Sequence, residues 1–169
     1  DVGKASPSFQ RKYAAALPIL TGAGFTFPRL IVNETVGHAT VTAATLGALL
    51  TMHSGLPKRE ARRIAATLGG HHGLWPSAQT IGTVKDDQLG RDSPWQNARD
   101  ALVHVLRELL QPPPLQSLGA SEEEENALLM LLSGLTSVAD WIGSMAEYFS
   151  FCGAFTKPAD YAAGASGRA

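Results

Sequence analysis

The sequence predicts an all-α protein, and three observations carry this prediction. Apolar residues recur at helical spacing in several long segments, and Pro or Gly stands where those segments begin or end. No stretch alternates convincingly between apolar and polar residues with β-branched enrichment, apart from a weak piece at 29–32. With 169 residues, 44% of them hydrophobic and 17% charged, the chain is large enough for one domain with a core.

Three helices are expected in the first half of the chain. The first covers residues 8–17, and the second covers 36–53 with a broad apolar stripe. The third begins at Pro57, because proline suits a helix start, and it ends at Gly69-Gly70. We expect these two glycines to let the backbone turn the next two side chains to one side.

The second half predicts further helices. Ser93-Pro94 are typical of an N-cap followed by the first helical position, and this helix should run to Pro112. Ser121 is expected to cap the next helix, because the four glutamates that follow it suit the positive end of a helix dipole. We expect that helix to stop at Ser133-Gly134 and another to reach about Phe149.

Two segments are expected to lack regular structure, and the C-terminal tail is distinguished by its composition. Residues 79–92 and 111–120 are predicted loops, and the tail from Pro158 is rich in Ala and Gly. Because this tail has no helix-ending signal, we expect the native chain to continue beyond residue 169.

Charge and composition restrict the partners. The net charge of −1 does not indicate a nucleic-acid binder, so any contact with DNA must come from a local patch or from another domain. The pairs Lys58/Arg62 and Arg59/Arg63 are each four apart and form two neighbouring strips on one helix; a solvated helix face is the alternative.

Nothing in the sequence predicts a membrane or an oxidising compartment. No apolar run is expected to reach a bilayer-spanning length, and no signal peptide pattern opens the chain. Cys152 is the only cysteine, which excludes an internal disulfide, and we expect a cytoplasmic protein.

Five residues that suit a divalent metal are spread over four segments: Asp1, His38, His71, His72 and Asp140. Such a set suits a dinuclear site for phosphodiester hydrolysis, and Lys4 would neutralise a phosphate oxygen. A histidine-rich set favours manganese, iron, cobalt, nickel or zinc over an all-oxygen magnesium site. His53 and His104 are interpreted as structural.

Asp140 stands inside an apolar helix, where an unpaired carboxylate would cost several kcal/mol. It therefore needs a partner, either an arginine or a metal ion. Ser137 and Ser144, on the same segment, suit phosphate contact and helix packing equally well.

Four strings together resemble a known family: Gly3-Lys4 with Phe9-Gln10, Gly37-His38-Ala39, His71-His72-Gly73, and Leu135 to Ile142 with Gly143-Ser144. They are similar, from Asp1 to about Ser150, to the HD nuclease domain of the type I CRISPR-associated helicase–nuclease. The resemblance implies an all-α HD-domain helical bundle and a metal-dependent nuclease acting on single-stranded DNA. The implied partners are a helicase domain or subunit and the CRISPR surveillance complex Cascade.

The resemblance also implies roles for individual residues. Asp1 would bridge two divalent ions (Mn, Ni, Co, Fe or Mg), Asp140 would bind the first, and the three histidines would bind the second. Lys4 would act with Asp1 in catalysis, and Ser137, Ser144, Lys58 and Arg62 are candidates for DNA or phosphate binding. The family's His before Asp1 is not in this chain, so we expect the native protein to begin earlier.

Two other functions stay open. HD folds also hydrolyse nucleotides and cyclic dinucleotides, although this sequence shows no Gly-rich phosphate loop and no obvious base-stacking pair. A degenerate site would instead leave an interaction module of a CRISPR complex.

Overall fold

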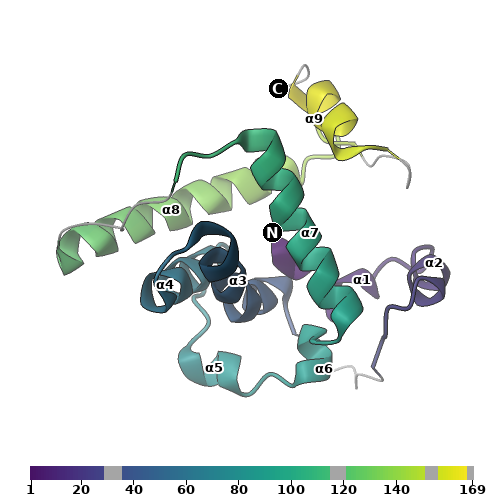
Figure 1. The fold of residues 1–169 in the computed structure, drawn as a ribbon, viewed down its shortest axis with the longest axis horizontal. Coiled ribbons are helices and arrows are strands. Elements are labelled where there is room, and N and C mark those ends of the chain that lie inside the picture. The colour runs from purple at the N-terminus through teal and green to yellow at the C-terminus, as the bar shows by residue number, and fades with distance from the viewer. Residues whose placement is uncertain (29–35, 115–120, 151–155, 167–169) are drawn as a thin grey trace.

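Every regular element in the described part of the chain is helical (Figure 1). The computed structural model describes residues 1–28, 36–114, 121–150 and 156–166. The all-α prediction is therefore confirmed over these ranges, while the weak piece at 29–32 lies outside them.

A hairpin of two helices forms the centre of the fold. Helix α3 (His38–Ser54) and helix α4 (Lys58–Leu68) lie side by side in Figure 1 and match the predicted helices at 36–53 and from Pro57. Gly55, at φ 67°, ends α3 in the left-handed conformation that glycine adopts without strain. Because the connection is short, α3 must start where α4 ends, which brings residues 38 and 71 to the same end of the hairpin.

Two buried clusters attach neighbouring elements to this hairpin. Leu56, Ala61 and Ile64 pack with Leu129 of α8 (Glu122–Gly143). A second cluster joins Leu46 and Ala65 to Val2 of the short 3-10 helix η1 (Val2–Lys4). Burial of these side chains stabilises the elements that carry both ends of the candidate site.

Helix α7 (Ser93–Leu110) is anchored at its start. The carboxylate of Asp92 accepts a hydrogen bond from the backbone of Trp95, so Asp92 is the N-cap and the predicted N-cap Ser93 is wrong by one residue. Trp95 is 1% exposed and packs edge-on against Phe25 and Phe27, with ring centroids 4.6 and 5.5 Å away.

Arg99 ties α7 to the chain that carries η1. Its guanidinium is buried and donates to the carbonyl oxygens of Ala5 at 2.8 Å, Leu89 at 3.0 Å and Gly90 at 2.6 Å. One side chain therefore satisfies three backbone acceptors from two segments that are about 85 residues apart in the sequence.

The predicted helix at 8–17 is wrong. The chain forms α1 (Pro7–Gln10), turns, and then α2 (Leu17–Gly22). Pro18 explains the interruption, because its ring would clash with the carbonyl of residue 14 in a continuous helix.

The predicted loop at 79–92 also contains short helices, α5 (Ala78–Gly82) and α6 (Asp86–Leu89). The Ser77 hydroxyl caps α5 by accepting from Thr80 N at 3.0 Å. The tail from Pro158, for which the sequence predicted no particular structure, is helical, as α9 (Pro158–Ser166).

Helix α8 starts as predicted but does not stop at Ser133-Gly134. The Ser121 hydroxyl accepts from Glu124 N at 3.2 Å, which confirms the predicted cap. The helix then continues to Gly143, so the expected break and the helix to Phe149 are wrong. Gly134 weakens a helix by about 1 kcal/mol but removes no hydrogen bond, and the flanking helix outweighs that cost.

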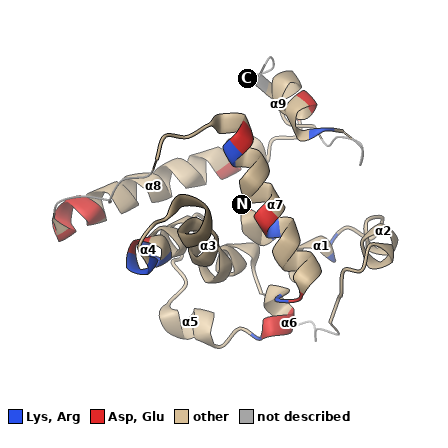
Figure 2. Ribbon diagram, in the orientation of Figure 1, with Lys and Arg blue, Asp and Glu red and all other residues tan. Residues whose placement is uncertain are grey.

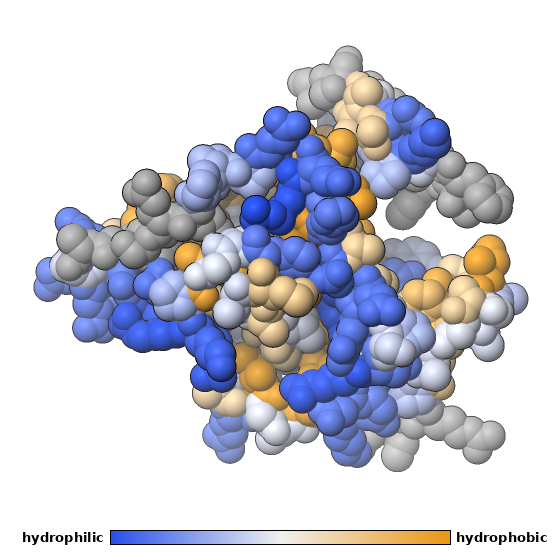
Figure 3. Space-filling view, in the orientation of Figure 1, coloured by the Kyte–Doolittle hydropathy of each residue, from blue (hydrophilic) through white to orange (hydrophobic). Residues whose placement is uncertain are grey.

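Orange, apolar residues are scattered among blue ones on the face of the molecule in Figure 3, and much of the apolar surface of α8 is exposed. Among the described helices, α8 alone is long and apolar enough to cross a membrane by length and composition. The expectation that no run reaches that length is therefore wrong for this helix. One such helix is weak evidence for a membrane span, and Leu129 packs into the core with α4.

Candidate metal centre

The five predicted ligands converge at one end of the α3–α4 hairpin. His38 is the first residue of α3, and His71 and His72 follow the end of α4. Asp1 precedes η1, and Asp140 lies in the last turn of α8. The hairpin brings the three histidines together, and the packing of η1 and α8 adds the carboxylates.

The glycines before His71 serve close packing. A Cβ on Gly69 would lie 2.6 Å from the Cβ of Ala43, and one on Gly70 would lie 2.2 Å from the Trp75 ring. Gly69 has φ −71°, and only Gly73 in this turn has positive φ, at 84°. Both histidine rings do turn to one side, as expected, and the two glycines contribute by letting α3 and Trp75 approach the backbone closely.

The ring nitrogens of the three histidines face one another. His38 Nε2 lies 3.3 Å from His71 Nε2 and 3.0 Å from His72 Nε2. His71 Nδ1 lies 2.6 Å from the carbonyl oxygen of Leu68, so this nitrogen carries the proton and Nε2 presents a lone pair. Three nitrogens this close, one of them a fixed lone pair, form a donor set for a cation.

The spacing of these atoms fits the coordination shell of one ion. Two ligands at about 2.1 Å from a metal lie about 3.0 Å apart in octahedral and about 3.4 Å apart in tetrahedral geometry. The Asp1 Oδ2 atom belongs to the same range, at 3.3 Å from His38 Nε2 and 3.5 Å from His71 Nε2. The distances from His38 Nε2 to the other three atoms are therefore those expected between ligands of one divalent ion.

His38 is neutral near pH 7. Burial, together with His72, His71 and Lys4, lowers the pKa of His38 to about 4. Its approach to Asp1 is therefore not an ion pair at neutral pH, and a metal would not have to compete with a second proton on this ring.

Asp1, His71 and Asp140 form a second group, whose ligand atoms lie within 4.8 Å of one another. His71 is common to both groups, whereas the resemblance assigned it to the second ion only. One face of this group opens to a cavity of about 400 Å³ that Lys4, Thr42 and Leu68 also line.

The partner of Asp140 is Lys4. Lys4 Nζ lies 3.1 Å from Asp140 Oδ1, so in this structure the carboxylate pairs with a lysine and not with an arginine. Burial raises the pKa of Asp140, but the hydrogen bond and charge of Lys4, with His71 and His72, outweigh it and lower the pKa overall. Asp140 is thus ionised at neutral pH and faces the cavity as an anion.

The two serines of the α8 segment that were predicted to contact phosphate, Ser137 and Ser144, make other contacts in the structure. The Ser137 hydroxyl is 2.8 Å from the carbonyl oxygen of His71 and 2.9 Å from that of Ser133, so it joins α8 to the histidine turn. Ser144 caps the C-terminus of α8 and its residue is exposed. Ser137 therefore has a packing role in this structure.

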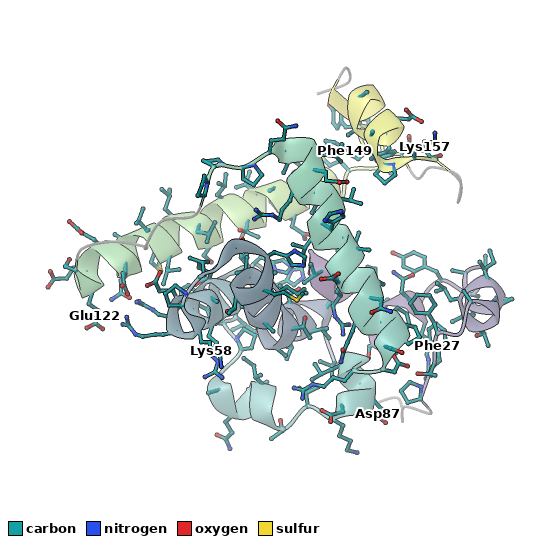
Figure 4. The ribbon with its side chains drawn as sticks, viewed as in Figure 1. Phe27, Lys58, Asp87, Glu122, Phe149 and Lys157 are labelled. Atoms are coloured by element: carbon teal, nitrogen blue, oxygen red, sulfur yellow. The ribbon has the colours of Figure 1, made fainter. Side chains whose placement is uncertain are left out.

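The basic strips of α4 separate as the spacing predicts. Arg59 and Arg63 pair with Glu125 of α8, and Figure 2 shows the basic residues of α4 and the acidic start of α8. Lys58 and Arg62 line a separate groove beside α3. Lys58, labelled in Figure 4, is roughly 15 Å along the helix axis from Leu68, so it does not reach the ligands.

Two residues that sequence reasoning missed support the site. Thr42, one turn after His38, donates to the Asp1 carboxylate and accepts from Gly3 N at 2.9 Å. Its position four residues after a predicted ligand was the available signal. The Leu68 carbonyl that orients His71 had no signal, because any residue offers a carbonyl.

His53 and His104 do not join the ligands. His53 Nε2 lies 2.6 Å from Asp100, and His104 Nε2 lies 3.3 Å from Glu108, one turn along α7. Both histidines therefore have acidic neighbours that the sequence interpretation did not recognise, and both pairs are consistent with a structural role.

Comparisons with known proteins agree with this geometry. Residues 1–149 match the family model described as "Cas3, HD domain". The chain is 33% identical over 151 residues to a CRISPR-associated endonuclease/helicase Cas3 of Thermus thermophilus. That match covers 89% of this chain and 16% of the relative.

A solved structure described as the crystal structure of a CRISPR-associated protein has the same fold. Its TM-score is 0.81 at 30% sequence identity, and the match covers 99% of this chain and 19% of that chain. The chain thus spans less than a fifth of either protein. The predicted HD-domain bundle is confirmed by this similarity.

Proposed function

Because this chain belongs to the Cas3 HD-domain family, we propose that it is a metal-dependent phosphodiesterase that cuts single-stranded DNA in CRISPR type I interference. The observation that supports this most is the donor spacing. His38 Nε2 lies 3.0–3.3 Å from ligand atoms of His71, His72 and Asp1, and His71 Nε2 lies 3.5 Å from Asp1 Oδ2. Asp140 adds a carboxylate across the cavity.

The proposed metal ligands are Asp1, His38, His71, His72 and Asp140. Two divalent ions, drawn from Mn, Ni, Co, Fe or Mg, would supply Lewis-acid and water-activating chemistry when bound. The neutral His38 and the fixed tautomer of His71 present lone pairs to them at neutral pH. Asp1 lies between the two groups of ligands, which suits a bridging role.

Lys4 is the proposed contact for the scissile phosphate. Its ammonium group lines the cavity beside Asp140, so a phosphate oxygen that enters there meets a positive charge. Asp140 keeps the ammonium in place at 3.1 Å until substrate arrives. Ser144, exposed at the end of α8, is a more distant candidate for the same strand.

Lys58 and Arg62 are proposed to hold the strand outside the site. They line a groove of about 420 Å³ between α3 and α4, floored by alanine and glycine. Backbone phosphates bind such cations without regard to sequence. The double variant Lys58→Glu/Arg62→Glu should weaken binding of single-stranded DNA and flatten its salt dependence, whereas Arg91→Glu should change neither.

The remaining functional predictions extend to the whole protein. A helicase domain or subunit and the Cascade complex are the proposed partners, and the Thermus thermophilus relative is named an endonuclease/helicase. We propose a cytoplasmic location on the basis of the sequence alone.

The decisive experiment uses the full-length protein with Mn²⁺ and a labelled DNA strand. We expect cleavage of single-stranded DNA, loss of cleavage with a chelator, and loss of at least about 100-fold in rate for His71→Ala. Intact DNA with folded, metal-loaded protein would contradict the nuclease. Rapid hydrolysis of dNTPs or cyclic dinucleotides in its place would support the phosphohydrolase, and no hydrolysis at all would support an interaction module.

A further inference from the structure

We propose that Thr42 is a positioning residue that gives the two oxygens of the Asp1 carboxylate different roles. Its hydroxyl holds one oxygen against the protein, which leaves the other oxygen available to a metal ion. This inference rests on the proposed metal site and adds a residue that is not itself a ligand.

The hydrogen bonds around Asp1 are asymmetric. Oδ1 accepts from Gly3 N at 3.0 Å and from the hydroxyl of Thr42. Oδ2 instead lies 3.3 Å from His38 Nε2 and 3.5 Å from His71 Nε2. Oδ1 therefore accepts the Thr42 hydroxyl and a share of the Gly3 N–H, which also donates to Thr42, while Oδ2 lies toward the histidine nitrogens.

The hydroxyl proton of Thr42 has a single acceptor. Gly3 N donates to Thr42 Oγ1 at 2.9 Å, so the hydroxyl oxygen acts as an acceptor there. Its single proton is then directed to Asp1 Oδ1. Because Thr42 is 3% exposed, water does not replace this donor.

Thr42 also differs from three other threonines inside the long helices. The hydroxyls of Thr45, Thr51 and Thr136 each donate to the carbonyl four residues earlier, at 2.8, 3.1 and 2.7 Å. That bond is the ordinary one for threonine inside a helix. Thr42 directs its hydroxyl away from α3 toward η1, as a contact between elements requires.

The position of Thr42 on α3 links its contact with Asp1 to the metal site. It lies one helical turn after His38, so the same helix that supplies a histidine also orients the carboxylate. The contact is close, because a Cβ on Gly3 would lie 2.5 Å from Thr42 Oγ1 and 1.9 Å from the His38 carbonyl oxygen. Groups that orient metal ligands typically change affinity by about 10–100-fold when removed.

The test compares three variants of the full-length protein by Mn²⁺ titration and by thermal melting without metal. Thr42→Val removes the hydroxyl and keeps the shape, so we expect the Kd for Mn²⁺ to rise by about tenfold or more. Thr42→Ser keeps the hydroxyl and should stay within about threefold of wild type. Thr45→Val, whose hydroxyl bonds only within α3, should bind as wild type does.

Several outcomes would overturn the inference. A Thr42→Val protein that melts early but binds Mn²⁺ like wild type would show a purely structural role. Weakening by Thr42→Ser as large as that by Thr42→Val would assign the effect to packing and not to the hydroxyl. If Thr42→Val does not fold, Thr42→Ala takes its place under the same criteria.

The two proposals fail separately. Absence of Mn²⁺ binding by folded wild type contradicts the proposed function. Wild-type binding together with an unaffected Thr42→Val contradicts the role of Thr42 alone.

Discussion

Replacement of Arg99 by methionine should destabilise the protein strongly although Arg99 lies outside the metal centre. Arg99 is 2% exposed, and its guanidinium donates to three carbonyl oxygens, those of Ala5, Leu89 and Gly90. Burial lowers the pKa of Arg99, against the opposing charge of Asp92, which reflects the cost of holding this cation in the interior. Methionine keeps the packing of the stem and removes all three donors.

The magnitude follows from the acceptors left behind. Each buried carbonyl without a partner costs about 1–3 kcal/mol. The variant no longer carries the cost of burying a cation, which offsets part of that loss. We therefore expect Arg99→Met to lower the free energy of unfolding by about 3–5 kcal/mol. For a domain of this size, about 2–4 °C of melting temperature corresponds to each kcal/mol, so the loss should be about 10 °C.

The measurement is urea denaturation followed by circular dichroism, with Arg91→Met as the matched control. Arg91 is also an arginine near the start of α7, but it is exposed and pairs with an exposed Asp86, so its replacement should cost less than about 1 kcal/mol. Equal midpoints for the two variants would refute the reasoning. So would an Arg99→Met protein within about 1 kcal/mol of wild type.

Three further predictions concern the candidate site. Below about pH 6.5 His38 becomes protonated in the unfolded chain, whereas in the folded protein it does so only near its pKa of about 4. The free energy of unfolding of metal-free protein should therefore fall as the pH is lowered through this window. Equal urea midpoints at about pH 7.5 and about pH 4.5 would contradict the lowered pKa. Asp140→Ala should change the free energy of unfolding of metal-free protein by less than about 1 kcal/mol, because the pair of Asp140 with Lys4 is partly exposed. The same variant should lose most of the rise in melting temperature that Mn²⁺ causes in the wild type. An undiminished rise would exclude Asp140 as a ligand. Gly3→Ala should lower the free energy of unfolding by about 3 kcal/mol and weaken Mn²⁺ binding, since its Cβ would lie 1.9 Å from the His38 carbonyl oxygen. Gly82→Ala is the control: its Cβ would have no atom within 4 Å, so neither stability nor Mn²⁺ binding should change.

The long helices were predictable because their end residues carry the signal. Ser121 caps α8, Pro57 precedes α4, and a glycine at φ 67° ends α3. The short helices were not predictable, because four to six residues cannot sustain a helix without tertiary contacts. The run at 8–17 shows the converse error, since helical spacing there does not reveal the obstruction by Pro18.

The ligands were predictable as residue types, and their arrangement was not. Aspartate and histidine in four strings indicate a metal site, and the resemblance orders them along the chain. The pairing of Lys4 with Asp140 depends on how α8 crosses η1, 136 residues away in sequence. Arg99 is similar: a charged residue within an amphipathic helix predicts a surface position, and only the fold shows three carbonyls around it.

The two halves of the site are held by interactions of different strength. The histidines project from the ends of α3 and α4, whose contact is filled by buried Leu46, Ile64 and Ala65. Asp1 and Asp140 are fixed instead by polar contacts, from Thr42 to Asp1 and from Lys4 to Asp140, each worth about 1 kcal/mol. Val2 also packs η1 against α3 and α4, whereas the buried residue of α8, Leu129, lies near the start of that helix, so the end of α8 that carries Asp140 can move locally while the histidines stay in place. An ion that binds both sides would join the end of α8 to the histidines, so metal binding and local order should rise together.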